Sequence, residues 1–172
     1  MVRSLIADYR AASVYSVSPS KLSELGFTTI FLDLDNTLAP YDVPKPEKRT
    51  YDYIEGLKKE GLEVILVSNN RAKRVKVFAS YLDVSYIASA HKPFAYKIVR
   101  YMKDRGIQKK KTLLAGDQVI NDMRMARKAG IKGLLTEPIS AHDHITAKAI
   151  RPLDRALRKK YRKQGRLGMS LD

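Results

Sequence analysis

The chain has 172 residues, the size of one domain, and 44% of them are hydrophobic, which suffices for a core. It has no cysteine, which excludes disulfides and thiolate-bound metals, and its formal net charge of +15 favours anionic partners. No apolar segment approaches the roughly 20 residues that span a bilayer, so we expect no transmembrane segment. The N-terminus lacks the apolar core of a secretory signal, and we expect a cytoplasmic protein.

Apolar runs and helical patterns alternate along the chain. We expect strands near residues 28–35, 63–68, 85–88, 112–116 and 132–136. We expect helices between them near residues 46–60, 71–82, 94–105 and 119–129, with a further helix signal at 18–26. This alternation predicts an α/β fold in which helices cover both faces of a mostly parallel sheet.

Two acidic residues stand at the end of the first predicted strand. Asp33 and Asp35 are two positions apart, so they would point to the same side of a continuing strand. Carboxylates this close repel one another unless a cation or a proton lies between them. The spacing favours Mg²⁺-assisted phosphoryl transfer, with one aspartate as nucleophile and the other as general acid and base. A solvated turn after the strand is the alternative.

Polar residues also follow the next strands. Ser68 ends the run at 63–68, where it could bind a phosphoryl group or cap the next helix. Asn69 is a candidate for the same phosphate site and also suits a turn. Lys92, which precedes a proline and a helical stretch, could be a surface lysine or could bind the anionic group.

A second acidic pair follows the strand predicted at 112–116. Asp117 comes directly after Gly116, and Asp122 follows five residues later. Gly116 would allow the backbone to approach a metal site closely. Asp122 could be a metal ligand, or a charge that the helix dipole stabilises. Because ligands bind at the carboxyl ends of parallel strands, we expect these acids to face those of the first strand.

In this order, the segments resemble the four motifs of the haloacid dehalogenase superfamily over about residues 28–136. The Asp-Leu-Asp-Asn-Thr-Leu run at 33–38 and the later Gly-Asp-Gln-x-x-x-Asp run are similar to YqeG-type phosphatases, a capless subclass III group. The resemblance implies a three-layer Rossmann-like fold without a cap domain. It also implies an Mg²⁺-dependent phosphatase.

The resemblance assigns roles to the candidate residues in the phosphate site. Asp33 would become an aspartyl-phosphate, while Asp35 would protonate the leaving oxygen and then activate water. Ser68 and Lys92 would bind the phosphoryl oxygens, with Asn69 beside them.

The resemblance also assigns the metal ligands. The Asp33 carboxylate, the Asp35 backbone carbonyl and Asp117 would hold Mg²⁺, a small set of oxygen ligands that this ion accepts. Asp122 would lie behind them or act as an alternative ligand.

We expect one domain over residues 1–172, with its core at about 28–136. The intervals 38–46 and 69–92 are too short for an inserted cap, so the site should be open. An open site suits a phosphate carried by a large object, such as a lipid surface, a nucleic acid or a protein.

The C-terminal stretch is predicted to form a basic amphipathic helix at about 143–163. Between residues 148 and 166 there are nine basic residues and one acid, Asp154. Its apolar stripe includes Leu153, Leu157 and Tyr161. Such a helix could lie on an anionic membrane or follow a nucleic-acid backbone, or its stripe could pack on the domain while its basic face stays solvated.

The YqeG-type group is similar to the phosphatidylglycerophosphate phosphatases of cardiolipin synthesis. A lipid phosphomonoester is therefore the first substrate hypothesis, which would place the protein peripherally on the inner face of a membrane. Two alternatives remain, a polynucleotide-end phosphatase and a non-catalytic basic adaptor that binds RNA, the ribosome or a membrane.

Overall fold

The computed structural model describes residues 6–140 and 145–172 and contains one sheet of seven strands. The strands are β1 (Ala7–Ala11), β2 (Thr29–Asp33), β3 (Glu63–Val67), β4 (Ser85–Ile87), β5 (Thr112–Gly116), β6 (Lys132–Thr136) and β7 (Leu167–Ser170). They lie in the order β4-β3-β2-β5-β6-β1-β7, and every neighbouring pair is parallel. Because β2 and β5 are adjacent at the centre, their carboxyl ends meet at one edge of the sheet.

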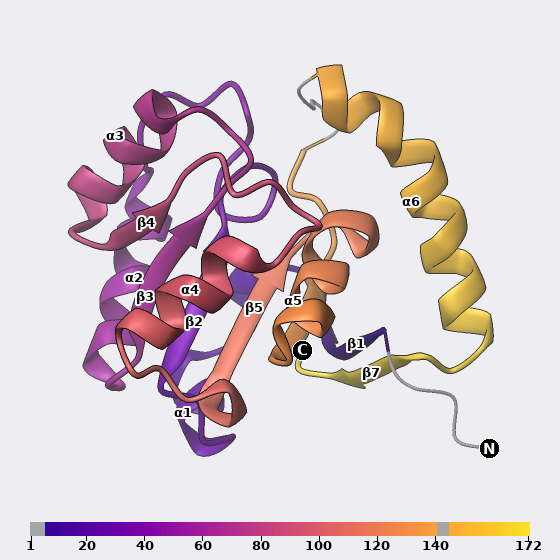
Figure 1. Cartoon of the computed structure of the whole chain (residues 1–172), viewed down its shortest axis with the longest axis horizontal. Helices are drawn as coiled ribbons and strands as arrows, with labels where there is room; N and C mark the ends of the chain where they lie inside the picture. Colours follow the sequence, from indigo (N-terminus) through magenta and orange to yellow (C-terminus); the bar gives the residue numbers. More distant parts are fainter. Residues whose placement is uncertain (1–5, 141–144) are drawn as a thin grey trace.

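Helices cover both faces of the sheet (Figure 1). They are α1 (Pro19–Glu24), α2 (Lys48–Lys59), α3 (Ala72–Leu82), α4 (Tyr96–Asp104), α5 (Arg124–Ala129) and α6 (Ile145–Lys163). Three shorter turns are η1 (Val14–Ser16), η2 (Lys109–Lys111) and η3 (Val119–Met123), of which η3 is a π-helix.

Two apolar cores lie on opposite sides of the sheet because successive strand residues point to opposite faces. In β2, Ile30 and Leu32 pack with side chains of α1, α2 and α3, whereas Phe31 packs with those of α4, α5 and α6. The fold is therefore the predicted three-layer α/β arrangement. Within the described chain, neither the β2–α2 nor the β3–β4 connection holds an inserted domain.

The five predicted strands are confirmed, but the structure adds β1 and β7 at one side of the sheet. The register joins Tyr9 to Leu134 of β6 and to Met169 of β7. These two segments are short and lack a continuous apolar run, so their strand character depends on pairing with distant parts of the chain.

Two helix predictions need correction. The helix expected at 119–129 is α-helical only from Arg124, because the segment before it winds as the π-helix η3. The C-terminal helix is confirmed at Ile145–Lys163, while residues 143 and 144 of the predicted range lie outside the described residues. Its predicted apolar stripe is partly wrong, because Leu153 is 59% exposed and the inward face contains charged residues.

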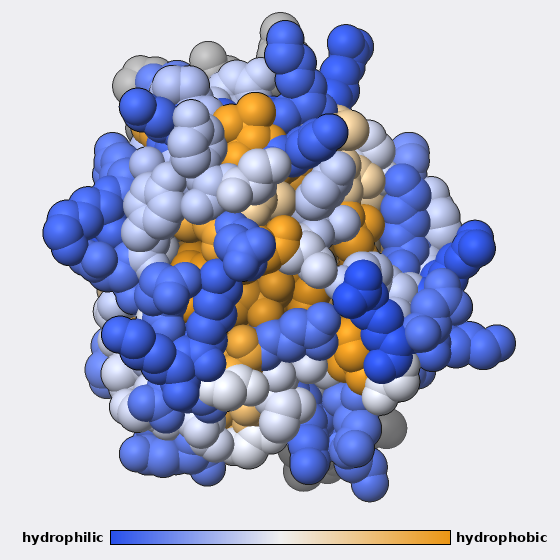
Figure 2. Space-filling model, turned by 90° about the vertical axis from the view of Figure 1, so that its left-hand side faces the viewer, coloured by the Kyte–Doolittle hydropathy of each residue, from blue (hydrophilic) through white to orange (hydrophobic). Residues whose placement is uncertain are grey.

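Figure 2 shows the side of the molecule on which α3 and the edge strand β4 lie, with charged side chains around an apolar centre. The exposed large hydrophobic residues of these elements are Val77, Tyr81 and Tyr86. The edge itself is only three residues long, which limits pairing with other strands. No helix in the described part of the chain is long and apolar enough to cross a membrane.

Candidate active site

A tight turn after β2 brings the first two acidic residues to the same cavity. The strand ends at Asp33, and the amides of Leu38 and Ala39 both donate to the carbonyl of Leu34 at 3.1 Å. Asn36 has a φ of 64°, a left-handed conformation that asparagine tolerates better than most residues. The turn, and not a continuing strand, therefore places Asp35 near Asp33.

Asp33 is buried, and each of its carboxylate oxygens accepts a hydrogen bond. Thr37 Oγ1 donates to its Oδ2 at 2.9 Å, and Lys92 Nζ donates to its Oδ1 at 2.6 Å. Lys92 Nζ also lies 2.6 Å from Asp122 Oδ1, so one lysine forms ion pairs with two carboxylates. The arrangement holds the Asp33 side chain in one orientation at the wall of the cavity.

Asp35 is more exposed and is held by a different cation. Arg74 Nε donates to its Oδ1 at 2.8 Å, and Ser68 Oγ lies 3.2 Å from its Oδ2. The other nitrogens of Arg74 donate to the carbonyls of Val43 and Pro40 at 2.6 and 3.0 Å. Arg74 thus connects α3 both to Asp35 and to the loop that follows it.

Ser68 and Asn69 organise the loop after β3. Ser68 Oγ accepts from the Asn70 amide at 3.0 Å, so it also forms the local turn contact that its position allows. Asn69 Oδ1 accepts from the Lys92 amide at 2.7 Å, and its Nδ2 donates to the Lys92 carbonyl at 3.3 Å. The side chain of Asn69 therefore holds the backbone of Lys92 in place.

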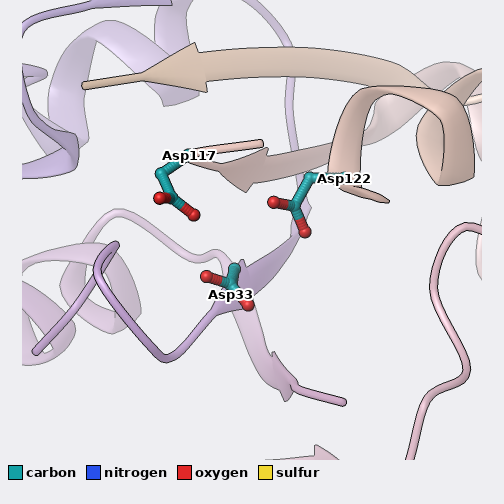
Figure 3. Close-up of side chains that lie close together, drawn as sticks. All are labelled: Asp33, Asp117 and Asp122. Carbon is teal, nitrogen blue, oxygen red and sulfur yellow. The ribbon is translucent and has the colours of Figure 1, made fainter. Parts of the chain in front are cut away.

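Asp117 and Asp122 converge on Asp33 from the end of β5 and from η3 (Figure 3). Each offers an oxygen, and the three atoms lie within 4.8 Å of one another. A Cβ on Gly116 would lie 2.3 Å from the Asp122 carboxyl carbon, so the site requires glycine there. Asp122 Oδ2 also accepts from the Gln118 amide at 3.0 Å, which fixes the loop between the two acids.

The C-terminal helix supplies a buried ionic network behind this cluster. Arg151 Nη1 donates to Asp117 Oδ2 at 2.7 Å, and Arg158 Nη2 donates to the Asp117 carbonyl. Asp154, which is fully buried, accepts from the Ile120 amide at 3.0 Å and from Arg158 Nε at 3.1 Å. The inward face of α6 therefore holds the Asp117–Asp122 loop through charge as well as through packing.

Burial shifts the ionisation of the cluster. It raises the pKa of Asp33 well above its ordinary value, although the nearby Lys92 opposes this shift. Burial and repulsion from Asp122 raise the pKa of Asp117 to about 7, despite the attraction of Arg151. For Lys92 burial acts in the opposite direction, but Asp122 and Asp33 outweigh it and its pKa is raised. The acidic cluster therefore needs positive charge to stay ionised at neutral pH.

A cavity of about 600 Å³ opens at the carboxyl edge of the sheet. Its walls include the predicted site residues Asp33, Asp35, Ser68, Asn69, Lys92 and Asp122. Asp117 does not line it and lies behind Asp33, next to α6. The structure thus brings together all seven predicted residues, six at the cavity wall and one beneath it.

The acidic cluster has the properties of a site for a hard cation. Asp117 Oδ1 is buried and has no hydrogen-bond partner within the described chain. A buried carboxylate oxygen without a donor is costly, and a divalent cation could occupy that position. Three buried aspartates with converging oxygens therefore fit a metal ion.

Sequence reasoning missed the two arginines that hold the acids. Arg74 is one of four basic residues at positions 71–76, and nothing in the local sequence distinguishes it from a residue on a solvated helix face. Arg151 is 34 residues from Asp117, and nothing in the local pattern connects the two. The sequence offers only a general indication, which is that a basic helix can form ion pairs with an acidic loop.

Comparisons with known proteins agree with this fold. Residues 39–136, more than half of the chain, match the family described as haloacid dehalogenase-like hydrolase. The chain is 28% identical over 162 residues to the "Probable phosphatase YqeG" of Bacillus subtilis (strain 168), covering 94% of both chains. The family match begins after Asp33 and Asp35, so the placement of these two residues rests on the geometry described above.

Two solved structures share the fold. An uncharacterized protein from Listeria monocytogenes serotype 4b has a TM-score of 0.53 at 17% identity, over 78% of this chain and 99% of that chain. A hypothetical protein from Xanthomonas campestris has a TM-score of 0.52 at 15% identity, over 76% and 78%. At these identities the likeness concerns the fold alone. Because the family match covers more than half of the chain, the chain belongs to the haloacid dehalogenase-like hydrolase family.

Proposed function

We propose that the protein is an Mg²⁺-dependent phosphomonoester hydrolase that works through an aspartyl-phosphate. The observation that carries this proposal is the position of Asp33. Its carboxylate is buried at the cavity wall between Lys92 and Thr37, and it faces the Asp117–Asp122 pair. A nucleophile held in one orientation beside fixed positive charge is what an in-line attack on phosphorus requires.

In the first half-reaction, an Asp33 oxygen attacks phosphorus and the bond to the leaving oxygen breaks. Asp35, in its protonated form, donates its proton to that oxygen, so the product leaves as an alcohol. Ser68 and Lys92 bind the phosphoryl oxygens in this proposal. Both line the cavity together with the two aspartates.

In the second half-reaction, Asp35 accepts a proton from water, which attacks the phosphorus of the aspartyl-phosphate. Inorganic phosphate and the free Asp33 carboxylate result. Asp33, the Asp35 carbonyl and Asp117 would hold Mg²⁺, with Asp122 as an alternative ligand. The bound ion would supply positive charge to the phosphoryl oxygens.

We further infer that residues 1–172 form one catalytic domain that includes α6. The support is the buried contact of Arg151 and Arg158 with Asp117, because these residues lie outside the segment that matches the family. A charged residue buried to this degree is retained only where it is paired.

The open cavity and the absence of an inserted domain in the described connections support a substrate whose phosphate is carried by a large molecule. Phosphatidylglycerophosphate is the first candidate, because of the similarity of the YqeG-type group to the phosphatases of that lipid. The exposed aromatic residues Phe94 and Tyr96, close in sequence to Lys92, would suit contact with a lipid surface. A cytoplasmic location at the inner face of a membrane belongs to this proposal.

A phosphorylated polynucleotide end is the second candidate substrate. The net charge of +15 and the exposed basic residues Arg71 and Lys73, close in sequence to Ser68, favour it. They would attract a polyanion toward the cavity.

Phosphate release with and without Mg²⁺ tests the proposal. Wild type and Asp33→Asn would each be given phosphatidylglycerophosphate in mixed micelles, a 5′-phosphorylated oligonucleotide and a small aryl phosphate. We expect Mg²⁺-dependent release from the lipid by wild type, and a loss of about 10³-fold or more in Asp33→Asn. Asp104→Asn, the same chemical change at an exposed position on α4, is the matched control and should keep its activity.

The three substrates separate the parts of the proposal. Release from the oligonucleotide but not the lipid would replace the first substrate candidate with the second. Release from the aryl phosphate alone would support the chemistry and contradict both substrates. If folded wild-type protein with Mg²⁺ released phosphate from none of them, the catalytic proposal would be wrong and the adaptor alternative would take its place.

A further inference from the structure

The two faces of α6 differ in charge and in burial. Its inward face carries the buried residues Arg151, Asp154 and Arg158, with the apolar side chains of Leu157 and Tyr161 packed on the core. The exposed residues from position 152 onward are Pro152, Leu153, Arg155, Ala156, Lys159, Lys160, Arg162 and Lys163. Five of these eight are cations and none is acidic, so the outer face has a net positive charge.

A hollow of about 560 Å³ lies where this outer face meets the inward residue Arg158 and Glu137, which follows β6. Its lining consists of Glu137, Arg155, Arg158, Lys159, Arg162 and Lys163. The single acid, Glu137, is already paired with Arg158 at 3.1 Å and with Arg162 at 3.4 Å. The hollow therefore keeps an excess of positive charge after its internal pairing.

Three cations of the hollow have no acidic partner within 4.0 Å in the described part of the chain. They are Arg155, Lys159 and Lys163. They are four residues apart on the helix, which places them on one face about 6 Å from one another along its axis. Like charges at this spacing repel, so an anion with several charged groups would relieve a repulsion that the folded chain leaves uncompensated.

The structure also limits the kind of anion. A helix that lies in a membrane interface embeds an apolar face in the lipid. In α6 the apolar side chains of Leu157 and Tyr161 are directed to the core, and Leu153 is the large apolar residue that remains exposed in the described part of the helix. A nucleic-acid backbone, by contrast, presents regularly spaced phosphates and needs only cations for binding.

We propose that the outer face of α6 is a nucleic-acid-binding surface, at which Arg155, Lys159 and Lys163 contact backbone phosphates without reading the base sequence. This surface shares no residue with the lining of the catalytic cavity. The inference therefore stands apart from the chemistry at Asp33, and binding can be measured without turnover.

The test is fluorescence anisotropy with a labelled single-stranded RNA of about 20 nucleotides that carries no terminal phosphate, in the absence of divalent cations. The variant replaces all three residues, Arg155→Gln, Lys159→Gln and Lys163→Gln. The matched control removes the same charge in η2, just before β5, by Lys109→Gln, Lys110→Gln and Lys111→Gln, all of which are exposed. Titrations between about 50 and 200 mM salt give the affinity and its salt dependence.

We expect wild type to bind with an affinity that falls steeply with salt. The α6 variant should bind at least about tenfold more weakly at low salt. The magnitude of the slope of log affinity against log salt should become smaller by about 2, as expected for three lost contacts to single-stranded phosphates. The control should lose less than about threefold. Melting temperatures of both variants should equal that of wild type because every changed side chain is exposed.

Three results would overturn the proposal. Wild type without measurable RNA binding would remove it directly. An equal loss in the α6 variant and the control would assign the attraction to net charge and not to this surface. Binding of phosphatidylglycerol-containing vesicles through the same three residues, without RNA binding, would make the surface a membrane contact. If the triple variant fails to fold, Lys159→Gln alone should still decrease the salt slope by about 0.7.

Discussion

The acidic cluster is neutralised from two sides, and the two sides differ. On the cavity side, Lys92 lies 2.6 Å from both Asp33 and Asp122. On the helix side, Arg151 lies 2.7 Å from Asp117. Lys92 lines the cavity, whereas Arg151 does not.

This difference indicates that the two cations have different roles. A cation that lines the cavity can stabilise a charge that develops in the reaction. A cation behind the cluster contacts a carboxylate that is itself fully buried, so it acts mainly by orienting that carboxylate and keeping it ionised. The two ion pairs should therefore respond differently to the same kind of substitution.

The largest effect is expected from Lys92→Met. It should decrease Mg²⁺-dependent phosphate release by about 10³-fold, since it removes the cation beside the nucleophile and leaves Asp33 and Asp122 facing one another. Steady-state kinetics with a small aryl phosphate measure the loss. Lys103→Met, on the exposed face of α4, should retain wild-type rates. A Lys92→Met loss below about tenfold would contradict a role for this lysine at the phosphoryl group.

The next effect concerns Arg151→Met on the other side of the cluster. We expect the free energy of unfolding to decrease by about 3–5 kcal/mol, because a fully buried carboxylate loses its cation. Urea unfolding in the absence of divalent cations measures the change. The loss of phosphate release should be smaller than that of Lys92→Met.

A double variant sharpens this comparison. Adding Asp117→Asn to Arg151→Met removes the unpaired charge, so part of the lost stability should return. No recovery in the double variant would show that Arg151 stabilises α6 by packing and not through Asp117.

The stability of the metal-free protein should depend on pH through Asp117. The folded pKa of about 7 lies above the ordinary 3.8, so the folded state holds this proton more tightly than the unfolded chain. Its stabilising contribution is complete below about pH 4, is lost as the pH rises through about 7, and amounts to a few kcal/mol at most.

Urea unfolding at about pH 5 and about pH 8 measures this dependence. Asp117→Asn should have a smaller difference between the two pH values than wild type. Added Mg²⁺ should also decrease the wild-type difference, because a bound cation favours the ionised carboxylate. Equal differences in wild type and Asp117→Asn would rule out Asp117 as the source.

The smallest effect is expected from Arg74→Gln. Arg74 orients Asp35 and the loop at Pro40 and Val43, but it is partly exposed and it does not contact Asp33 in the described interactions. Phosphate release should fall about tenfold through kcat, less than the 10²-fold or more that proton transfer itself contributes. Arg74→Lys, which keeps the charge without the fork of nitrogens, should recover part of the rate. A change in KM alone would instead indicate substrate binding.

Much of the central sheet could be predicted because its signals are local. The alternation in β2 sends Phe31 to one core and Ile30 and Leu32 to the other, and the apolar run by itself indicates a buried strand. Asp33 ends β2 and Asp117 follows β5, two strands whose carboxyl ends meet, so their proximity follows from a parallel sheet. The order of the motifs then indicated Lys92 as their partner.

The outer strands had no comparable signal. β1 and β7 pair over a separation of some 160 residues, as Tyr9 with Met169. Asp8 stabilises this side of the sheet by accepting from Lys132 Nζ at 2.7 Å and from the Gly133 amide at 3.0 Å. A short mixed sequence becomes a strand here because a neighbouring strand offers hydrogen bonds, a condition that no local window contains.

The sequence by itself determined the hydrolase family, the central parallel sheet and the acids at its edge, because strand periodicity and motif order are properties of neighbouring residues. Only the tertiary structure decided which cation forms an ion pair with which acid, and which face of α6 packs on the core. The ion pair of Arg151 with Asp117 depends on where the last helix docks. The helix docks through apolar packing and ion pairs between residues far apart in the chain. In this position Arg155, Lys159 and Lys163 lie on its outer face.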